Sequence, residues 1–268
     1  MLRVGVIGCG TIGAEICQAI DRGVVEAALA GVSDIDAAKA QALAQGLGAR
    51  PPVLPQGELI GASELVVEAV SRAVAPSIIA ACLERGRDVM VMSVGGLLER
   101  VDEFVGLARR QGRRIYVPTG AIAALDAVKG ACVASVSRVT LTTRKPPKGL
   151  EGAPYVVQNR IDLGAVREPT VIFTGPAREA VPAFPANVNV AAALSLAGIG
   201  ADRTLVRVVA DPTGTRNVHE IEAEGDFGRL SVRMENVPSP HNPKTSYMAA
   251  LSAIALLRRI TAPLVVGT

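Results

Sequence analysis

The chain has 268 residues, of which 49% are hydrophobic and 20% charged, and its formal net charge is +3. This composition supplies enough apolar material for one large domain or two smaller ones. The basic residues are scattered in short pairs, so they do not form the basic patch typical of proteins that bind nucleic acid. We therefore expect an ordered globular protein whose partner is a small molecule and not a nucleic acid.

The four cysteines lie far apart and form no C-x-x-C pair. Because no signal peptide precedes the first apolar run, we expect free thiols in the reducing cytoplasm. No uncharged apolar stretch reaches the roughly 20 residues that a membrane helix needs. We therefore expect no membrane contact, and we assign no metal site.

The N-terminal segment combines an apolar run, a glycine motif and a helical pattern. Residues 2–7 (LRVGVI) are followed by GCGTIG at 8–13 and by AEICQAIDRG. This order predicts a strand, a tight turn and a helix whose N-terminus binds the pyrophosphate of a dinucleotide. We assign five residues to cofactor binding, namely Gly8, Gly10, Thr11, Ile12 and Gly13.

The second apolar run, AALAGVSDID, predicts a strand that ends at Asp34. An acid about 20 residues after the third glycine of such a motif accepts hydrogen bonds from the ribose hydroxyls. Asp34 therefore favours NAD as the cofactor, although NADP stays possible.

The rest of the first half alternates between strand and helix patterns. Strands are expected at 64–71, 88–94 and 113–118, and helices at 74–85 and about 99–111. This alternation predicts a Rossmann-like, doubly wound parallel sheet. Small residues at two strand ends are expected beside the nicotinamide half of the cofactor, unless they only form short loops: Ala69, Val70, Ser93 and Val94.

From residue 119 the pattern changes to a helix and then to strands with alternating polar and apolar residues, which is typical of a sheet with one face in water. Helices are expected at about 121–134, 178–200 and 245–260, and strands at 135–145, 169–175, 204–211, 218–225 and 229–237. We predict a dinucleotide-binding domain at 1–118, an α+β substrate domain with a mainly antiparallel sheet at 119–245, and a C-terminal helix within 246–268 that packs in either domain. The segment 145–154 is predicted to be a mobile loop.

Histidine is rare in this chain, which has only His219 and His241. In the strand 218–224, Val218 and three glutamates (Glu220, Glu222 and Glu224) share one face. His219, Ile221 and Ala223 occupy the other face. Because the glutamates must face solvent, His219 is predicted on the covered face. This position suits a core histidine and equally a general acid or base.

Several stretches together resemble one known family, the L-aspartate dehydrogenases. They are IGCGTIG (7–13), SVGGL (93–97), PTGAIAALDA (118–127), RKP (144–146), VIFTGPAREA (171–180), FPANVNVAAALSLAGIGADRT (184–204), NVHEIEAEG (217–225) and NPKTS (242–246). The resemblance implies NAD(P)-dependent oxidation of L-aspartate to iminoaspartate. That product feeds pyridine-nucleotide synthesis or hydrolyses to oxaloacetate and ammonia.

The resemblance also implies roles for particular residues. It gives His219 the catalytic role and places Ala121 and Asn189 at the nicotinamide. The two substrate carboxylates need cations or N–H groups. We therefore expect substrate contacts from Lys244 and Thr245, which precede a helical run, and from Asn187, which also suits a helix cap. His241 is interpreted as a surface histidine, and a homodimer is expected.

Three alternatives remain open at this point. Two are other two-domain reductases, resembling dihydrodipicolinate reductase or homoserine dehydrogenase, whose signatures around the catalytic lysines or histidines are not found here. The third is a non-catalytic protein that senses NAD. Such a sensor would have no need of a half-buried histidine.

Overall fold

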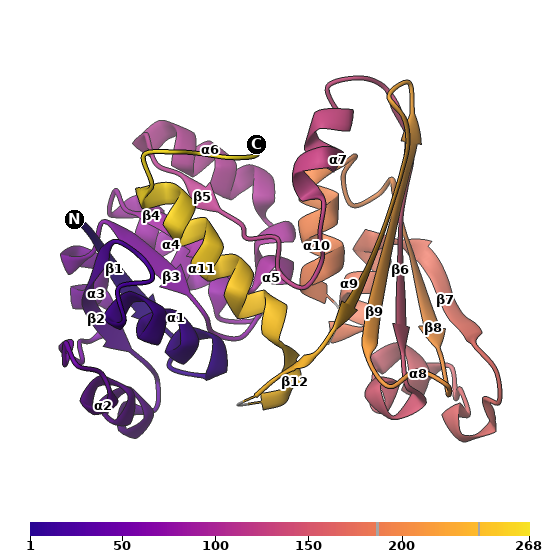
Figure 1. Cartoon of the computed structure of the whole chain (residues 1–268), viewed down its shortest axis with the longest axis horizontal. Helices are drawn as coiled ribbons and strands as arrows, with labels where there is room; N and C mark the ends of the chain where they lie inside the picture. The colour runs from indigo at the N-terminus through magenta and orange to yellow at the C-terminus, as the bar shows by residue number, and fades with distance from the viewer. Residues whose placement is uncertain (186–187, 241) are drawn as a thin grey trace. The chain divides into compact units, whose positions relative to one another are not determined.

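The chain forms two compact units, which are coloured from indigo to yellow along the sequence in Figure 1. This computed structural model describes residues 1–185, 188–240 and 242–268. The first unit comprises Met1–Pro118 and Ala249–Val266, and the second comprises Thr119–Met248 and Gly267–Thr268. No helix within the described ranges is long and apolar enough to cross a membrane. All four cysteines are free thiols.

The first unit is built on a five-stranded, wholly parallel sheet in the order β2-β1-β3-β4-β5. Its strands are β1 (Leu2–Ile7), β2 (Ala27–Ser33), β3 (Leu65–Glu68), β4 (Asp88–Val91) and β5 (Ile115–Tyr116). Its helices are α1 (Thr11–Asp21), α2 (Ala37–Gly46), α3 (Gln56–Ala62), α4 (Ala75–Glu84), α5 (Val94–Leu98), α6 (Val101–Gln111) and α11 (Tyr247–Thr261). The predicted doubly wound sheet is confirmed.

The turn between β1 and α1 needs glycine at two positions. Gly8 has a φ of +102°, and a Cβ there would lie 2.3 Å from the carbonyl oxygen of Ala69. At Gly13 a Cβ would lie 1.9 Å from the carbonyl oxygen of Gly8, so any side chain would push helix and strand apart. These two glycines let the chain turn tightly and let α1 begin directly above the sheet.

Two predicted strands of the first unit end three residues earlier than expected. The strand predicted at 64–71 stops at Glu68. The Glu68 carboxylate accepts a hydrogen bond from the backbone N–H of Val70, and the chain turns there. The strand predicted at 88–94 stops at Val91, and Val94 instead begins the short helix α5. Apolar composition alone does not separate a strand end from a buried helical turn.

Helix α11, near the C-terminus, packs into the core of the first unit. Ala253 and Leu257 are fully buried there, in one cluster with Val4 and Val6 of β1 and Ile16 of α1. The burial follows from the helical spacing of the apolar residues in α11. The C-terminal helix is thus part of the hydrophobic core of the first unit.

The second unit is built on a mixed five-stranded sheet in the order β10-β9-β6-β8-β7, in which only β6 and β8 are parallel. Its strands are β6 (Val136–Lys145), β7 (Thr170–Pro176), β8 (Thr204–Ala210), β9 (Asn217–Gly225), β10 (Gly228–Asn236) and the separate pair β11 (Pro238–Ser239) and β12 (Asn242–Ser246). Its helices are α7 (Leu125–Ala131), α8 (Pro154–Gln158), α9 (Ala177–Ala183) and α10 (Val188–Ala197), with 3-10 turns η1 (Pro147–Leu150) and η2 (Leu163–Ala165). The predicted α+β fold with a mainly antiparallel sheet is confirmed.

The single helix predicted at 178–200 is wrong, because the segment forms the two helices α9 and α10. Pro182 lies inside α9, which ends at Ala183, and Pro185 follows the C-cap residue Phe184. Phe184, the residue before Pro185, adopts a φ of −134° and a ψ of 73°, outside the helical region. A residue before proline avoids helical angles, and proline has no N–H to continue the ladder, which explains the break.

Helices α7 and α10 cover one face of this sheet, as Figure 1 shows. A Cβ at Gly198, just after α10, would lie 3.4 Å from Val128 of α7 and 3.9 Å from Val139 of β6. Val139 pairs with Ala223, Leu141 with Ile221 and Thr143 with His219. Cross-strand partners point to the same face, so all six side chains belong to the covered side.

The segment 145–154, predicted as a mobile loop, contains a strand end and a 3-10 turn. Lys145 is the last residue of β6, the turn η1 follows, and Leu150 is 2% exposed. The backbone N–H of Asp211 donates to the carbonyl of Lys145 at 2.8 Å, which extends the β6–β8 pairing to this point. The prolines and glycines that suggested a loop form a compact turn instead.

We predict that Leu257→Ala destabilises the protein by about 2–5 kcal/mol, because it opens a cavity in the core. Leu251→Ala is the matched control on the same helix, since Leu251 is 38% exposed. We expect the control to change the free energy of unfolding by only about 0.5 kcal/mol. Urea denaturation followed by circular dichroism measures both, and equal effects would contradict the burial of α11.

Candidate functional site

The first unit contains a cavity of about 800 Å³ beside the glycine turn. Five predicted site residues line it, namely Gly8, Gly10, Asp34, Ala69 and Val70. Gly10 is the N-cap of α1 and has no side chain, and a Cβ there would meet nothing within 4 Å. Thr11, Ile12 and Gly13 form the first turn of that helix. The positive end of the helix dipole and an open backbone therefore meet at Gly10, which suits an anionic ligand.

Asp34 is fixed at the mouth of this turn by two backbone donors. Its Oδ2 accepts a hydrogen bond of 2.7 Å from the N–H of Cys9, and its Oδ1 accepts one of 2.9 Å from Asp36. The carboxylate is thus held beside the glycine loop while it lines the cavity. It retains lone pairs for a second partner such as a pair of ribose hydroxyls.

Val70 and Ser93, which were predicted from two separate strand ends, lie together. The hydroxyl of Ser93 donates to the carbonyl of Val70 at 2.6 Å. The Glu68 carboxylate accepts from the N–H of Val70 at 2.9 Å and from the N–H of Ser93 at 3.0 Å. Val94 follows at the start of α5 and is 3% exposed. One carboxylate therefore joins the ends of β3 and β4.

Glu68 was not predicted as a site residue, although an acid inside the apolar run LVVEAV was a visible signal. Glu68 is fully buried, and burial raises the pKa of its carboxyl despite the two N–H donors. A buried acid needs such donors to offset the loss of water. Glu68 thus fixes the backbone of two predicted site residues.

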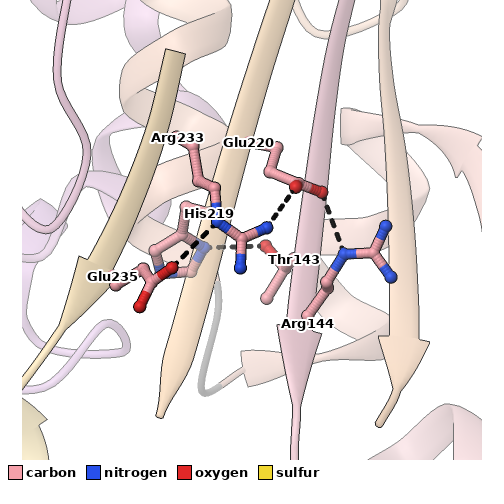
Figure 2. A network of polar contacts seen from close by, with 6 residues as sticks. All are labelled: Thr143, Arg144, His219, Glu220, Arg233 and Glu235. Atoms are coloured by element: carbon pink, nitrogen blue, oxygen red, sulfur yellow. Dashed lines mark hydrogen bonds and ion pairs between the residues drawn. The ribbon is translucent and has the colours of Figure 1, made fainter. Parts of the chain in front are cut away.

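In the second unit, His219 lies on the covered face of β9, as predicted, and is 5% exposed. Its Nδ1 and the hydroxyl of Thr143 on β6 are 2.9 Å apart and form a hydrogen bond, which Figure 2 shows. A hydroxyl can accept from a protonated Nδ1 or donate to a bare one. Thr143 therefore holds the ring in place in either tautomer and leaves Nε2 for another partner.

The imidazole is neutral at neutral pH in this environment. Burial, and then the positive charge of Lys145, lower the pKa of His219 from 6.5 to about 4. Both effects penalise the imidazolium, by removing water and by like-charge repulsion. A neutral ring with one free nitrogen is ready to accept a proton once the local charge balance changes.

Lys145 is a second residue of this kind, which was not predicted as a site residue. It continues the covered face of β6 after Val139, Leu141 and Thr143 and is 7% exposed. Burial lowers the pKa of its ammonium to about 8. The signal was a lysine in an apolar alternation, which the neighbouring prolines and glycines disguised as a loop.

The opposite face of the same strands carries ion pairs. Arg144 donates to Glu220 at 2.9 Å, Arg233 donates to the other oxygen of Glu220, and Arg233 also donates to Glu235 at 3.0 Å (Figure 2). The glutamates of β9 are half-buried, as suits their pairing with arginines. Val218 is the exception on this face, because it is only 8% exposed where solvent contact was expected.

Comparison with known proteins assigns the family. The model of the aspartate dehydrogenase C-terminal domain matches residues 126–260, and that of the homoserine dehydrogenase NAD-binding domain matches residues 8–118. An L-aspartate dehydrogenase of Methanocella arvoryzae is 52% identical over 100% of both chains, and one of Bradyrhizobium diazoefficiens is 50% identical over 100% of this chain and 94% of its own. The chain belongs to the aspartate dehydrogenase family.

The fold agrees with that of a solved relative of the same family. The crystal structure of aspartate dehydrogenase from Thermotoga maritima has a TM-score of 0.75 and 22% identity, with 100% of each chain covered. A myo-inositol dehydrogenase from Corynebacterium glutamicum is more distant, with a TM-score of 0.54 and 14% identity over 97% of this chain and 87% of its own. The two-unit architecture is therefore shared beyond the aspartate dehydrogenase family.

The family resemblance also pointed to Ala121, whose backbone is already engaged. The side-chain amide of Asn236 donates to the carbonyl of Ala121 at 2.9 Å, and the hydroxyl of Ser246 donates to the amide oxygen of Asn236 at 2.7 Å. Asn236 is 3% exposed. This chain of bonds ties the segment before α7 to the end of β12.

The remaining predicted residues of the second unit that the structure describes lie in α10 and β12. Asn189 is exposed in the first turn of α10, and Thr245 is half-buried in β12. Lys244 also lies in β12, which pairs with β11, so NPKTS is a strand before α11 and not a loop. Asn187 and His241 lie outside the described residues. No group of three or more potential metal ligands gathers among the residues described.

We predict that His219 titrates near pH 4 and not near 6.5. Since the folded-state pKa is depressed, the unfolded chain binds the proton first as the pH falls. The free energy of unfolding should therefore fall as the pH drops from about 6.5 to about 4, by up to about 3 kcal/mol from this group.

Two measurements check this prediction. A His241→Asn variant leaves His219 as the single histidine, so its imidazole signal can be followed by NMR against pH. In His219→Asn, the stability loss between pH 6.5 and 4 should be smaller than in the parent protein. A midpoint between pH 6 and 7 would contradict the prediction.

Proposed function

We propose that this protein oxidises L-aspartate to iminoaspartate with NAD(P) as the hydride acceptor. The observation that carries the proposal is the 52% identity, over the full length of both chains, to a relative named L-aspartate dehydrogenase. The buried His219, whose ring has one free nitrogen, is the acid–base group that such a reaction needs.

NAD(P) is the cofactor, and the residues of the first unit fit it. The bare N-terminus of α1 at Gly10 suits the pyrophosphate, and Asp34 suits the ribose hydroxyls. Ala69, Val70, Ser93 and Val94 are proposed beside the nicotinamide half, with Glu68 as the residue that fixes Val70 and Ser93. When bound, the cofactor supplies the acceptor for the hydride that leaves the substrate Cα.

His219 is proposed to move the protons that accompany this oxidation. With Nδ1 bonded to Thr143, Nε2 is the atom that takes a proton from the substrate ammonium or activates the water that attacks the imine. For Nε2 to accept a proton, the neutral ring must carry its own proton on Nδ1. The Nδ1–H then donates a hydrogen bond to the hydroxyl oxygen of Thr143. Thr143 is thus a positioning residue for the general base.

Other residues of the second unit are proposed to orient the ligands. The family resemblance places Ala121 and Asn189 near the nicotinamide, and the bond from Asn236 to Ala121 fixes that backbone. Lys244, Thr245 and Asn187 are proposed around the substrate carboxylates. Residues 1–118 would thus serve as the dinucleotide-binding domain and 119–245 as the substrate domain, with the helix of 246–268 completing the first.

We also propose a cofactor preference, an assembly and a cellular location. Asp34 favours NAD over NADP because a carboxylate repels a 2′-phosphate. We propose a cytoplasmic homodimer whose product feeds pyridine-nucleotide synthesis. The match of residues 8–118 to a homoserine dehydrogenase model concerns the cofactor domain only, so homoserine is a control substrate and not a second candidate.

Absorbance of the reduced cofactor at 340 nm tests the activity with L-aspartate, L-malate and L-homoserine. We expect reduction with L-aspartate alone. The His219→Ala variant should lose turnover by about 100-fold or more, as expected for a general base, while its NAD affinity stays unchanged. A protein that reduces NAD with L-homoserine but not with L-aspartate would sink the proposal.

The cofactor preference has its own test at Asp34. Asp34→Asn keeps an acceptor for the Cys9 N–H but removes the charge, so we expect the ratio of NAD to NADP efficiency to fall about tenfold. Asp36→Asn is the matched control, because Asp36 caps α2 and asparagine caps equally well. An equal change in both variants would show that Asp34 does not contact the ribose.

A further inference from the structure

Lys145 is a buried cation without a counter-ion. Among the residues whose side chains are described, it is the one lysine or arginine that is buried, with 7% of its surface exposed. It forms no hydrogen bond or ion pair through its ammonium with any of them. Burying a charge without a partner is costly, so an unpaired buried lysine needs a reason.

The neighbouring cation on the same strand shows the contrast. Arg144 points to the opposite face of β6 and is paired with Glu220 at 2.9 Å. Lys145 lies on the covered face, where Gly149 of η1 leaves room for its stem: a Cβ there would lie 3.7 Å from the Lys145 Cδ. The backbone of Lys145 is fixed by the N–H of Asp211 at 2.8 Å. The residue is therefore held firmly, and its ammonium alone is left without a partner.

The position of Lys145 joins it to the candidate base. Thr143 pairs with His219 across the β6–β9 ladder, and Lys145 is two residues further along the same face of β6. Its positive charge reaches the imidazole, since it contributes to the lowered pKa of His219. Thr143, His219 and Lys145 thus form one polar group at the end of an otherwise apolar sheet face.

We infer that Lys145 is the cation that binds a carboxylate of the dicarboxylic substrate beside His219. This inference rests on the proposed aspartate oxidation and adds a buried cation to the residues proposed around the substrate carboxylates. An ammonium–carboxylate pair compensates the buried charge and orients the substrate with a charge-assisted hydrogen bond. The incoming carboxylate also offsets the repulsion between Lys145 and the imidazole, so His219 becomes a better proton acceptor when substrate is bound.

A general base at Lys145 is the competing role, because burial lowers the pKa of its ammonium to about 8. The two roles differ in which kinetic constant they control. Loss of a substrate-binding cation raises KM, whereas loss of a base lowers kcat and removes a limb of the pH profile.

The test compares Lys145→Met with Lys148→Met, an exposed lysine in η1 that serves as the matched control. We expect Lys145→Met to raise KM for L-aspartate about 10- to 100-fold, with a much smaller change in kcat and an unchanged NAD affinity. Calorimetric titration with succinate, a dicarboxylate without the amine, should show a similar loss of affinity. Lys148→Met should behave as the unsubstituted protein in both experiments.

Stability supplies a second readout. Because Lys145 is charged and buried without a partner, Lys145→Met should melt at the same temperature or higher while binding substrate worse. Unchanged KM and unchanged succinate affinity would overturn the inference. So would a loss of kcat at constant KM, which would make Lys145 the base.

The experiments distinguish a failure of the proposed aspartate oxidation from a failure of the proposed role of Lys145. A protein that binds NAD but never oxidises L-aspartate would overturn the proposed reaction. The succinate titration does not depend on turnover, so it still decides whether Lys145 binds a dicarboxylate. Tight succinate binding that Lys145→Met retains would reject Lys145 even in an active enzyme.

Discussion

The register between β6 and β9 is the constraint on which the candidate site depends. It places Thr143 opposite His219, and it sends both side chains to the face that α7 and α10 cover. A shift of one residue would move His219 to the solvent face and bring the glutamates into the core. The apolar pairs Leu141–Ile221 and Val139–Ala223 oppose this shift, because it would expose Ile221 and Ala223 to solvent.

Three ionisable groups that the structure buries lie where strands begin or end. Glu68 ends β3, Lys145 ends β6, and His219 lies near the start of β9. Burial raises the pKa of Glu68 and lowers the pKa values of Lys145 and His219, so it favours the neutral form of each group. Each group therefore lowers the stability of the folded protein when it is charged. Glu68 offsets that cost with two backbone donors, whereas Lys145 does not. Proteins tolerate such a cost mainly at functional sites.

Local patterns predicted much of the fold and part of the site. The glycine motif gave the turn before α1, and the alternation in β9 put His219 on the covered face, since both depend on neighbours in the chain. The same patterns failed at 178–200, where the helix breaks before Pro185, and at 145–154, where a turn-rich composition concealed a strand end. Glu68 and Lys145 were missed because an acid and a lysine are normally exposed.

The sequence by itself determined the class of fold, the family and the candidates Asp34 and His219, because each follows from short-range spacing or from motif identity. Only the tertiary structure decided which side chains meet: Glu68 with the N–H groups of Val70 and Ser93, and Thr143 with His219. The contacts of Glu68 with Ser93 and of Thr143 with His219 join residues far apart in the chain through strand pairing. Burial, hydrogen-bond partners and shifted pKa values depend on that pairing, and composition and periodicity carry no record of it.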